Sequence, residues 1–320
     1  MKKIISILMT LALMATMLFA FTSCSDDKDI IGIMQFGSHE SLNNCKEGII
    51  QGLEERGITE ENYTIEVLNS NFDMVTAQNQ AEKLVNKGVK VIIAIATPSA
   101  IQAATAALGK DIPVVYCAVT DKATMEGYSN VTGASDVPNF DKQLELVTAF
   151  MGKENLKIGV LYSTSESSSP YQVELLKEAA KKYNGMEIKV KAVADITAID
   201  TYTNSLVDEG VDCFVNLLDN TIVGKLSNIL AITDAKKIPV FGSEIEQVKV
   251  GCAASASIEY ITVGKLAGLA AAQILLDGKS ASDIPVQTIT EPNNYYNSEV
   301  CSELGLSLPT SVSAKDVIEK

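Results

Sequence analysis

The 320-residue sequence predicts an α/β protein of two Rossmann-like lobes, each built on a parallel sheet and joined to the other by a multi-strand hinge. Short apolar runs alternate with longer amphipathic stretches, as in βαβ units. This alternation occurs twice along the chain with matched spacing. The length also suits two domains of about 150 residues each. A ligand cleft between the lobes is the expected consequence of such an arrangement.

The first half contains the first repeat of this pattern. We expect strands near 29–35, 63–69, 89–96, 112–117 and 131–134, with helices near 41–56, 74–87 and 98–109. The second half repeats the rhythm. Its expected strands lie near 156–162, 187–193, 211–217 and 238–242, and its expected helices near 170–184, 197–209 and 220–235.

Individual residues also repeat between the halves. Ile31-Gly32-Ile33 corresponds to Ile158-Gly159-Val160, and Ile112-Pro113-Val114 corresponds to Ile238-Pro239-Val240. The matched order indicates two lobes of similar fold. Duplication of one ancestral half and convergence on one packing solution both account for it.

The remaining segments connect the lobes. A helix at 136–152 is expected to carry the chain from the first lobe to the second. It is followed late in the chain by a strand near 252–258, a helix at 260–277, a strand near 284–290 and a helix near 297–304. If the helix at 260–277 returns to the first lobe, several segments form a hinge. We therefore expect lobe one to comprise 29–137 plus 259–284, and lobe two to comprise 138–258 plus 285–320.

The N-terminus has the features of a secretory signal. Two lysines precede an apolar run that ends in Phe21-Thr22-Ser23-Cys24, and the chain then becomes acidic and polar. Small residues just before a cysteine resemble a bacterial lipoprotein signal. We expect residues 1–23 to be the signal peptide, Cys24 to be lipidated and 24–28 to form a tether. An uncleaved membrane anchor is the alternative.

Composition excludes several classes of protein. With 26 basic and 40 acidic residues the net charge is −14, so no basic face is available for nucleic acid. His39 is the only histidine, which excludes multi-histidine zinc sites, and no metal site is expected. We expect His39 to make one hydrogen bond at a surface or cleft rim. The five cysteines after Cys24 are widely spaced, and we expect them to be buried filler.

The sequence also lacks the signatures of common enzymes. No dinucleotide fingerprint, P-loop or hydrolase nucleophile elbow occurs in it. We therefore expect no catalytic residue, no cofactor and no enzymatic activity. Arg56 is the only arginine, and its charged helical surroundings place it away from a site. A ligand carboxylate must then be held by hydroxyl groups and helix amides.

Ligands of open α/β sheets bind at the carboxyl ends of the strands. This rule selects the polar and aromatic residues that follow each expected strand. In lobe one they are Gln35, Phe36, Thr97, Ser99, Thr120 and Asp121. In lobe two they are Ser163, Ser168, Ser169, Asp219, Asn220, Ser243 and Glu244.

Each candidate also has a purely structural interpretation. The segment Thr97-Pro98-Ser99 suits an anion site or an empty helix cap equally well. Asp219 is either an ammonium receptor or the N-cap of the following helix, with no preference between the two. Asp121 and Glu244 are further carboxylates at strand ends. Phe36 suits an aromatic contact with ligand, although core packing is favoured.

Taken together, these motifs resemble the extracytoplasmic substrate-binding lipoproteins of ABC transporters, in the group with tryptophan- and tyrosine-binding members. The likeness covers about Ile30 to Pro309. The segments that carry it include Ile31-Gly32-Ile33-Met34-Gln35-Phe36, Ala94-Ile95-Ala96-Thr97-Pro98, Lys142-Gln143-Leu144-Glu145-Leu146 and Asp219-Asn220-Thr221. Two positions depart from the family pattern: Lys122 stands in place of proline, and Leu218 in place of a small or polar residue.

This resemblance implies a type I periplasmic-binding-protein fold and a cleft that captures an amino acid without catalysis. It implies that the Thr97 loop and the serine-rich loop bind the ligand carboxylate and that Asp219 or Asn220 binds its amine. The expected partners are an ABC permease and its ATPase, with the monomeric protein held at a bacterial membrane, in the periplasm or on the outer surface, by its lipid. Aromatic amino acids lead among the ligands, followed by branched-chain amino acids and then nucleosides or sugars. A ligand-sensing co-receptor is the alternative.

Overall fold

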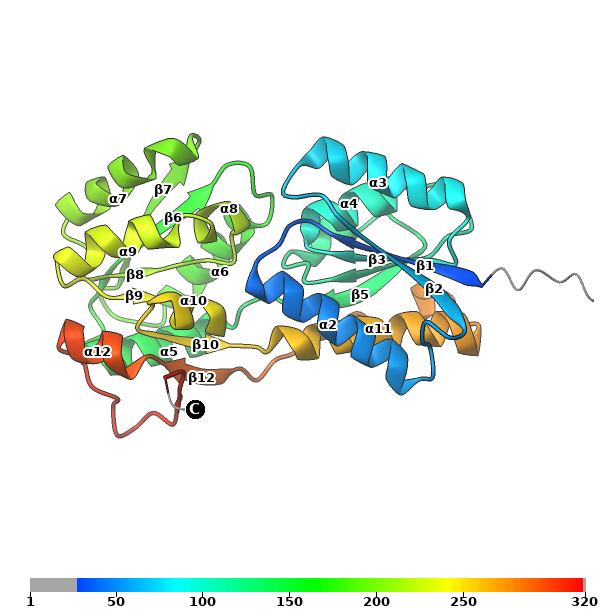
Figure 1. The fold of residues 1–320 in the computed structure, drawn as a ribbon. Coiled ribbons are helices and arrows are strands. Elements are labelled where there is room, and N and C mark those ends of the chain that lie inside the picture. The colour runs from blue at the N-terminus through cyan, green and yellow to red at the C-terminus, as the bar shows by residue number, and fades with distance from the viewer. Residues whose placement is uncertain (1–27, 319–320) are drawn as a thin grey trace, which may run out of the picture.

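The structure, a computed structural model, describes residues 28–318. The expected signal peptide and the lipidation site Cys24 lie outside the described residues. Within the described chain, two lobes lie side by side and are joined by segments that run along one edge (Figure 1).

Lobe one contains a six-stranded sheet in which all pairs are parallel. The strand order is β11-β5-β4-β3-β1-β2. The strands are β1 (Asp29–Gln35), β2 (Tyr63–Asn69), β3 (Val91–Ile95), β4 (Val114–Cys117), β5 (Val131–Ser135) and β11 (Gln287–Thr288). The middle strands are apolar on both faces because helices cover both sides of the sheet.

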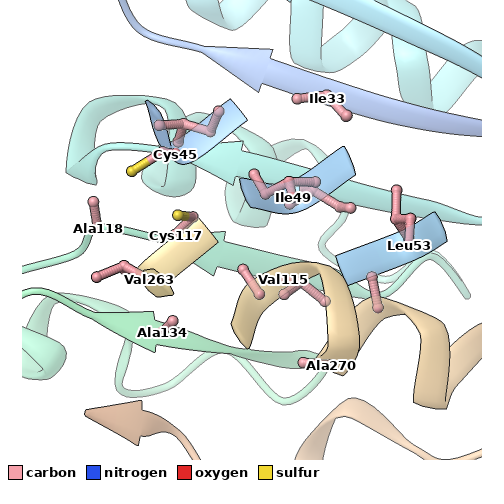
Figure 2. Packing of buried hydrophobic residues seen from close by; sticks show 14 of the residues in the cluster. Ile33, Cys45, Ile49, Leu53, Val115, Cys117, Ala118, Ala134, Val263 and Ala270 are labelled. Carbon is pink, nitrogen blue, oxygen red and sulfur yellow. The ribbon is translucent and has the colours of Figure 1, made fainter. Parts of the chain in front are cut away.

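Each face of this sheet has its own helical layer. The helices are α2 (Glu40–Glu55) and α11 (Tyr260–Asp277) on one face, and α3 (Met74–Lys87) and α4 (Thr97–Ala106) on the other. Alternate strand residues therefore enter different cores: Ile93 packs under α2 and α11, whereas Ile92 packs under α3 and α4. Figure 2 shows Cys45 and Ile49 of α2 above the strand residues Val115 and Cys117.

Helices α2 and α11 approach each other unusually closely, through glycines spaced four residues apart on each. A Cβ atom on Gly48 would lie 2.0 Å from the Ile261 carbonyl oxygen, and one on Gly264 would lie 2.1 Å from the Cys45 carbonyl oxygen. Gly52 and Gly268 form similar contacts one turn further along. Because these glycines have no side chains, the backbones of the two helices can touch. Helix α11 therefore lies directly against α2, although it comes from the end of the chain.

Lobe two repeats the arrangement with a parallel sheet of order β7-β6-β8-β9. Its strands are β6 (Lys157–Ser163), β7 (Glu187–Val193), β8 (Cys213–Val215) and β9 (Val240–Phe241). Helices α5 (Phe140–Met151) and α6 (Ser169–Ala180) cover one face. The other face is covered by α7 (Ile199–Asp208), α8 (Asn220–Val223), α9 (Leu226–Ala235) and α10 (Ile245–Val250). The order β7-β6-β8-β9 matches β2-β1-β3-β4 in lobe one, in agreement with the sequence repeat.

Three segments of the described chain connect the lobes. They lead from β5 to α5, from β10 (Ala254–Ser257) to α11, and from β11 to β12 (Asn293–Tyr296). A small sheet completes lobe two, in which β12 pairs with β10 and with β13 (Lys315–Asp316), and α12 (Ser298–Leu304) joins the lobe-two core. The chain thus returns to lobe one through α11 and β11 and ends on lobe two.

The expected elements differ from the observed ones at several places. The helix expected at 220–235 is wrong: Gly224 and Lys225 separate α8 from α9. Strand β12 and helix α10 were not expected. Strand β11 pairs with β5 in lobe one, whereas the expected boundary assigns residues from 285 onward to lobe two. For the rest of the chain we propose the expected division into lobes.

Candidate functional site

A cavity lies between the lobes, at the carboxyl ends of the strands in both sheets. Its volume is about 30 Å³, so the closed cavity itself is small. From lobe one it is lined by His39, Ser41, Leu42, Ala96, Thr97, Ala118, Thr120, Asp136 and Tyr260. From lobe two it is lined by Glu166, Ser168, Leu218, Asp219, Asn220, Val223 and Glu244. We call this space the interlobe cavity.

The backbone of lobe one is strained where it reaches the cavity. Ala96 and Ala118 directly follow β3 and β4, and their φ angles are 74° and 57°. Both angles lie in the left-handed region, which costs a non-glycine residue of order 1–3 kcal/mol. Amide hydrogen bonds hold the two turns in place, from Ala96 N to Cys117 O at 2.9 Å and from Ala118 N to Ala134 O at 2.9 Å. Among the described residues, two of the five non-glycine residues with positive φ thus lie at the cavity wall.

The turn at Ala96 leads directly into α4. Thr97 begins the helix and lines the cavity, with Pro98 in the first turn. The first amides of a helix have no partners within it and attract negative charge. The Ser99 side chain is 1% exposed, and its hydroxyl has no hydrogen-bond partner among the described residues. This end of α4 can therefore receive an anionic group.

Four buried carboxylates line the same cavity: Asp136, Glu166, Asp219 and Glu244. Thr120 Oγ1 donates to Asp136 at 2.8 Å, and Tyr260 OH donates to it at 3.0 Å. None of the four forms an ion pair within residues 28–318. Because burial of an unpaired charge is costly, the cavity favours either protonated carboxyls or a cationic ligand group.

Burial raises the pKa of all four carboxyl groups. It raises the pKa of Glu166 and of Glu244 to about 7, and it also raises the pKa of Asp136 and Asp219. The negative charge of Asp219 adds to the effect on the pKa of Glu166. At neutral pH a ligand ammonium would therefore change the protonation of the cavity as it binds.

The geometry of Asp219 supports its interpretation as an N-cap, and its role as an ammonium receptor stays a prediction. Asp219 is the N-cap of α8 and accepts from Ile222 N at 3.0 Å through Oδ1. Its Oδ2 accepts from Ser163 N and from the Ser169 hydroxyl, each at 2.7 Å. Both oxygens are thus occupied by the protein, although the residue also lines the cavity. We conclude that Asp219 fixes the shape of the cavity wall, whatever it contributes to ligand binding.

Hydrogen bonds join the two lobes across the mouth and floor of the cavity. His39 Nε2 lies 2.9 Å from Asn220 Oδ1, at hydrogen-bonding distance. Ser41 Oγ donates to Glu244 Oε2 at 2.7 Å. Outside the cavity, Asn44 Nδ2 donates to Glu246 Oε1 at 2.8 Å. Each bond pairs α2 or its N-cap with a loop or helix of lobe two, so the structure is in a closed arrangement.

The structure brings together about half of the residues that the sequence selects. Six line the interlobe cavity: Thr97, Thr120, Ser168, Asp219, Asn220 and Glu244. Ser168 is the N-cap of α6, which begins with a serine and a proline, and its side chain does not cap the helix. Phe36 lies at the cavity mouth, in a neighbouring pocket.

The other selected residues support the fold around the cavity. Gln35 donates to Gly37 O at 2.7 Å, and Asp121 caps a short 3₁₀ helix (Lys122–Met125) through Ala123 N. Ser243 donates to Asn216 O at 2.7 Å. Ser163, Ser169 and Ser99 are buried behind the wall. We retain their contact with ligand only as a prediction.

Several residues of the cavity were not expected from the sequence. Asp136 directly follows β5, but the sequence assigned it to the helix expected at 136–152. Glu166 belongs to the serine-rich loop at 163–169, from which only serines were selected. Ser41 is the second residue of α2, just beyond the loop that follows β1. Tyr260 could not be found in this way, because it follows β10 of lobe two and enters the cavity only through the chain crossing.

The chain also resembles known proteins. Residues 30–318 match the family model for ABC transporter substrate binding protein. The chain belongs to this family. It is 38% identical over 284 residues to the tyrosine-binding protein of Clostridioides difficile, covering 86% of this chain and 81% of that protein. Members of this family bind solutes outside the cytoplasm and are not enzymes.

Two solved structures of such substrate-binding proteins are similar to this one. The first is a Streptococcus pneumonia protein in complex with L-Trp, with a TM-score of 0.82 and 32% identity, covering 89% of this chain and 97% of that one. The second is a ligand-free, open substrate-binding protein with adhesive properties from Clostridium difficile. Its TM-score is 0.71 at 33% identity, covering 91% of this chain and 100% of that one. The lower score with the open structure agrees with the hydrogen bonds that join the lobes here.

Proposed function

We propose that this substrate-binding protein captures an amino acid, most favourably an aromatic one, in the interlobe cavity. The observation that carries the proposal is the set of four buried carboxylates that share the cavity with the N-terminus of α4 and form no ion pair within residues 28–318. A zwitterion supplies the positive charge that the carboxylates lack and the negative charge that the helix amides accept. The tyrosine-binding relative and the L-Trp complex support this ligand class.

The two ends of the zwitterion bind different walls. Its carboxylate accepts hydrogen bonds from Thr97 and the free amides of α4, on lobe one. Its ammonium group lies near Glu166, on lobe two, whose pKa is raised to about 7 by burial. A ligand held in this way connects both lobes, so it binds the closed form more tightly than the open form. Ligand therefore shifts the population toward closure.

The working cycle we propose is import without catalysis. The closed, loaded protein docks on a membrane permease driven by an ATPase on the other side of the membrane. Lipidation at Cys24 holds the chain at the membrane. Loss of residues 1–23 removes two lysines and changes the net charge from −14 to −16, which keeps the chain soluble beside the membrane surface. The chain uses no cofactor and no metal in this cycle.

The test uses the chain from Ser25 onward, unfolded and refolded to remove bound ligand. Thermal unfolding is measured with each of the twenty amino acids, with nucleosides and with sugars. A ligand at 100 times its Kd stabilises the fold by about 2.7 kcal/mol and raises Tm by several degrees. We expect the shift with tyrosine, tryptophan or phenylalanine. A shift only with nucleosides or sugars would overturn the ligand class.

Two variants connect that shift to the cavity. Thr97→Ala removes one hydroxyl facing the ligand carboxylate, and Glu166→Gln removes one charge facing the ammonium. Each is expected to weaken binding about tenfold or more, because hydrogen bonds to charged groups contribute about 1.5–3 kcal/mol. Ser282→Ala, on the surface far from the cavity, is the control and should bind as the parent does.

A further inference from the structure

We infer that a second, apolar pocket at the mouth of the interlobe cavity holds the aromatic ring of the bound amino acid, an inference that rests on the proposed function. We call it the rim pocket. Its apolar walls are Phe36, Phe72, Met74 and Pro98 from lobe one, and Ile196 and Val223 from lobe two. The ligand's charged groups stay in the interlobe cavity and its ring points outward into the rim pocket.

The two spaces are continuous. His39, Glu166, Asn220 and Val223 line both of them. The rim pocket has a volume of about 420 Å³, against about 30 Å³ in the interlobe cavity. The larger and more apolar space is therefore directly next to the cavity that holds the carboxylates. A ring placed here also leaves the carboxylates free to receive the ammonium group.

Phe72 is presented to the rim pocket by a strained backbone. Asn71 and Phe72 have φ angles of 51° and 63°, so two consecutive non-glycine residues are left-handed. The Phe72 side chain is 45% exposed, which means that burial alone does not compensate for this strain. Hydrogen bonds hold the conformation, because Phe72 N and Ser70 Oγ each donate to Phe36 O at 2.7 Å.

The ring of Phe72 is also fixed in position by its neighbours. It meets the ring of Phe36 edge to face, with centroids 5.7 Å apart. It lies parallel to the imidazole of His39 at 6.2 Å. A Cβ atom on Gly37 would lie 2.2 Å from this ring, so only glycine at position 37 lets the ring pack there. A rigid, half-exposed aromatic ring at the mouth of a binding cavity loses little conformational entropy when a ligand ring packs on it.

The absence of tryptophan from the chain provides a direct measurement. When L-tryptophan is the ligand, its indole is the only one in the sample, so selective excitation reports on its surroundings alone. We expect the indole emission to move to shorter wavelength on binding, as it does in apolar surroundings. Binding measured by calorimetry without such a shift would place the ring in the polar cavity and overturn the inference.

Variants at the rim then separate packing from folding. Phe72→Ala is expected to weaken L-tryptophan binding at least about tenfold and to reduce the shift in emission, because it removes a ring-to-ring contact together with buried apolar area. Phe72→Tyr keeps the ring and should bind within about twofold of the parent. Gly37→Ala should resemble Phe72→Ala, since it displaces the ring. Val75→Ala, 66% exposed and outside the pocket, is the matched control.

Failure of this inference differs from failure of the proposed function. If no amino acid binds the parent protein, the proposed function is wrong. If L-tryptophan binds the parent and Phe72→Ala equally well, the function stands and the rim pocket does not hold the ring. The melting temperature of each ligand-free variant shows that its fold is intact, and L-alanine, which has no ring, should bind the parent and Phe72→Ala with equal affinity.

Discussion

Ser41 at the start of α2 donates a hydrogen bond of 2.7 Å to Glu244, which is the N-cap of α10 in the other lobe. Both residues are buried, at 1% and 3% exposure, so the bond exists only while the lobes are closed around it. Glu244 lines the interlobe cavity, so the bond joins the cavity wall of lobe two to α2, the helix that packs along α11. This direct contact between two side chains that are 203 positions apart in sequence is therefore a marker of the closed form.

Loss of this contact should favour the open form. We expect Ser41→Ala to weaken amino-acid binding about 3- to 30-fold, because a buried acceptor on Glu244 loses its partner. Calorimetry measures the affinity, and small-angle scattering measures the fraction of closed protein. Glu47→Ala, on the exposed face of the same helix, should change neither. A Ser41→Ala variant that binds and closes as the parent does would show that the contact is incidental.

The affinity should depend on pH through the buried carboxylates. Burial raises the pKa of Glu166 and Glu244 to about 7, and a ligand ammonium group favours their ionised forms. Affinity is therefore expected to rise between pH 5 and pH 8, with protons released on binding near pH 7. Titration calorimetry in buffers of different ionisation enthalpy counts these protons. A flat or falling affinity over that range would exclude the ammonium contact.

The same groups have the opposite effect on the ligand-free fold. Their pKa values are higher in the folded protein than in the unfolded chain, so the folded state binds more protons. Stability from this source is present at low pH and is lost as pH rises from about 4.5 to about 7. We expect Glu166→Gln to reduce this loss. Urea unfolding of the ligand-free protein at pH 5 and pH 8 measures how much unfolding free energy is lost between these two pH values. An equal loss in the variant and the parent would show that Glu166 is not the group that titrates.

The contact between α2 and α11 should tolerate no added methyl group. Gly48→Ala places a Cβ atom 2.0 Å from the Ile261 carbonyl oxygen, so the two helices must separate. We expect a loss of about 1–3 kcal/mol in the free energy of unfolding, despite the better helix propensity of alanine. Urea unfolding measures it, with Glu47→Ala as the exposed control. Unchanged stability would mean that the helices are not in contact along these glycines.

Asp219 should matter for both stability and binding. Asp219→Ala removes the cap of α8 and leaves the Ser163 amide and the Ser169 hydroxyl without their acceptor. We expect a loss of about 1–3 kcal/mol in unfolding free energy, together with weaker binding. Asp219→Asn keeps one acceptor oxygen and should recover part of the stability. If Asp219→Ala unfolds as the parent does, the hydrogen bonds to Asp219 do not hold this wall of the cavity.

The sequence by itself determined the elements of the fold. Helix 74–87 and strands 29–35, 63–69 and 187–193 lie where periodicity predicts them, because apolar spacing and capping residues are local properties. It also determined which strand ends face the cleft, and so it found Thr97, Thr120 and Asp219. Local pattern failed at 220–235, where Gly224 and Lys225 interrupt the helix although its apolar spacing continues.

Only the tertiary structure decided which polar groups meet. Asp136, Glu166 and Glu244 are far apart in the chain, and nothing local shows that they share one cavity. Nor does any local pattern show that none of them forms an ion pair with another described residue. Tyr260 reaches Asp136 because α11 crosses back to lobe one, and Phe72 reaches Phe36 because β1 and β2 end side by side. The way the two lobes meet depends on many contacts between residues that are far apart in the sequence. Each helix or strand, in contrast, depends mainly on its own residues. The fold could therefore be read from the sequence, while the chemistry of the cavity depended on how the lobes close.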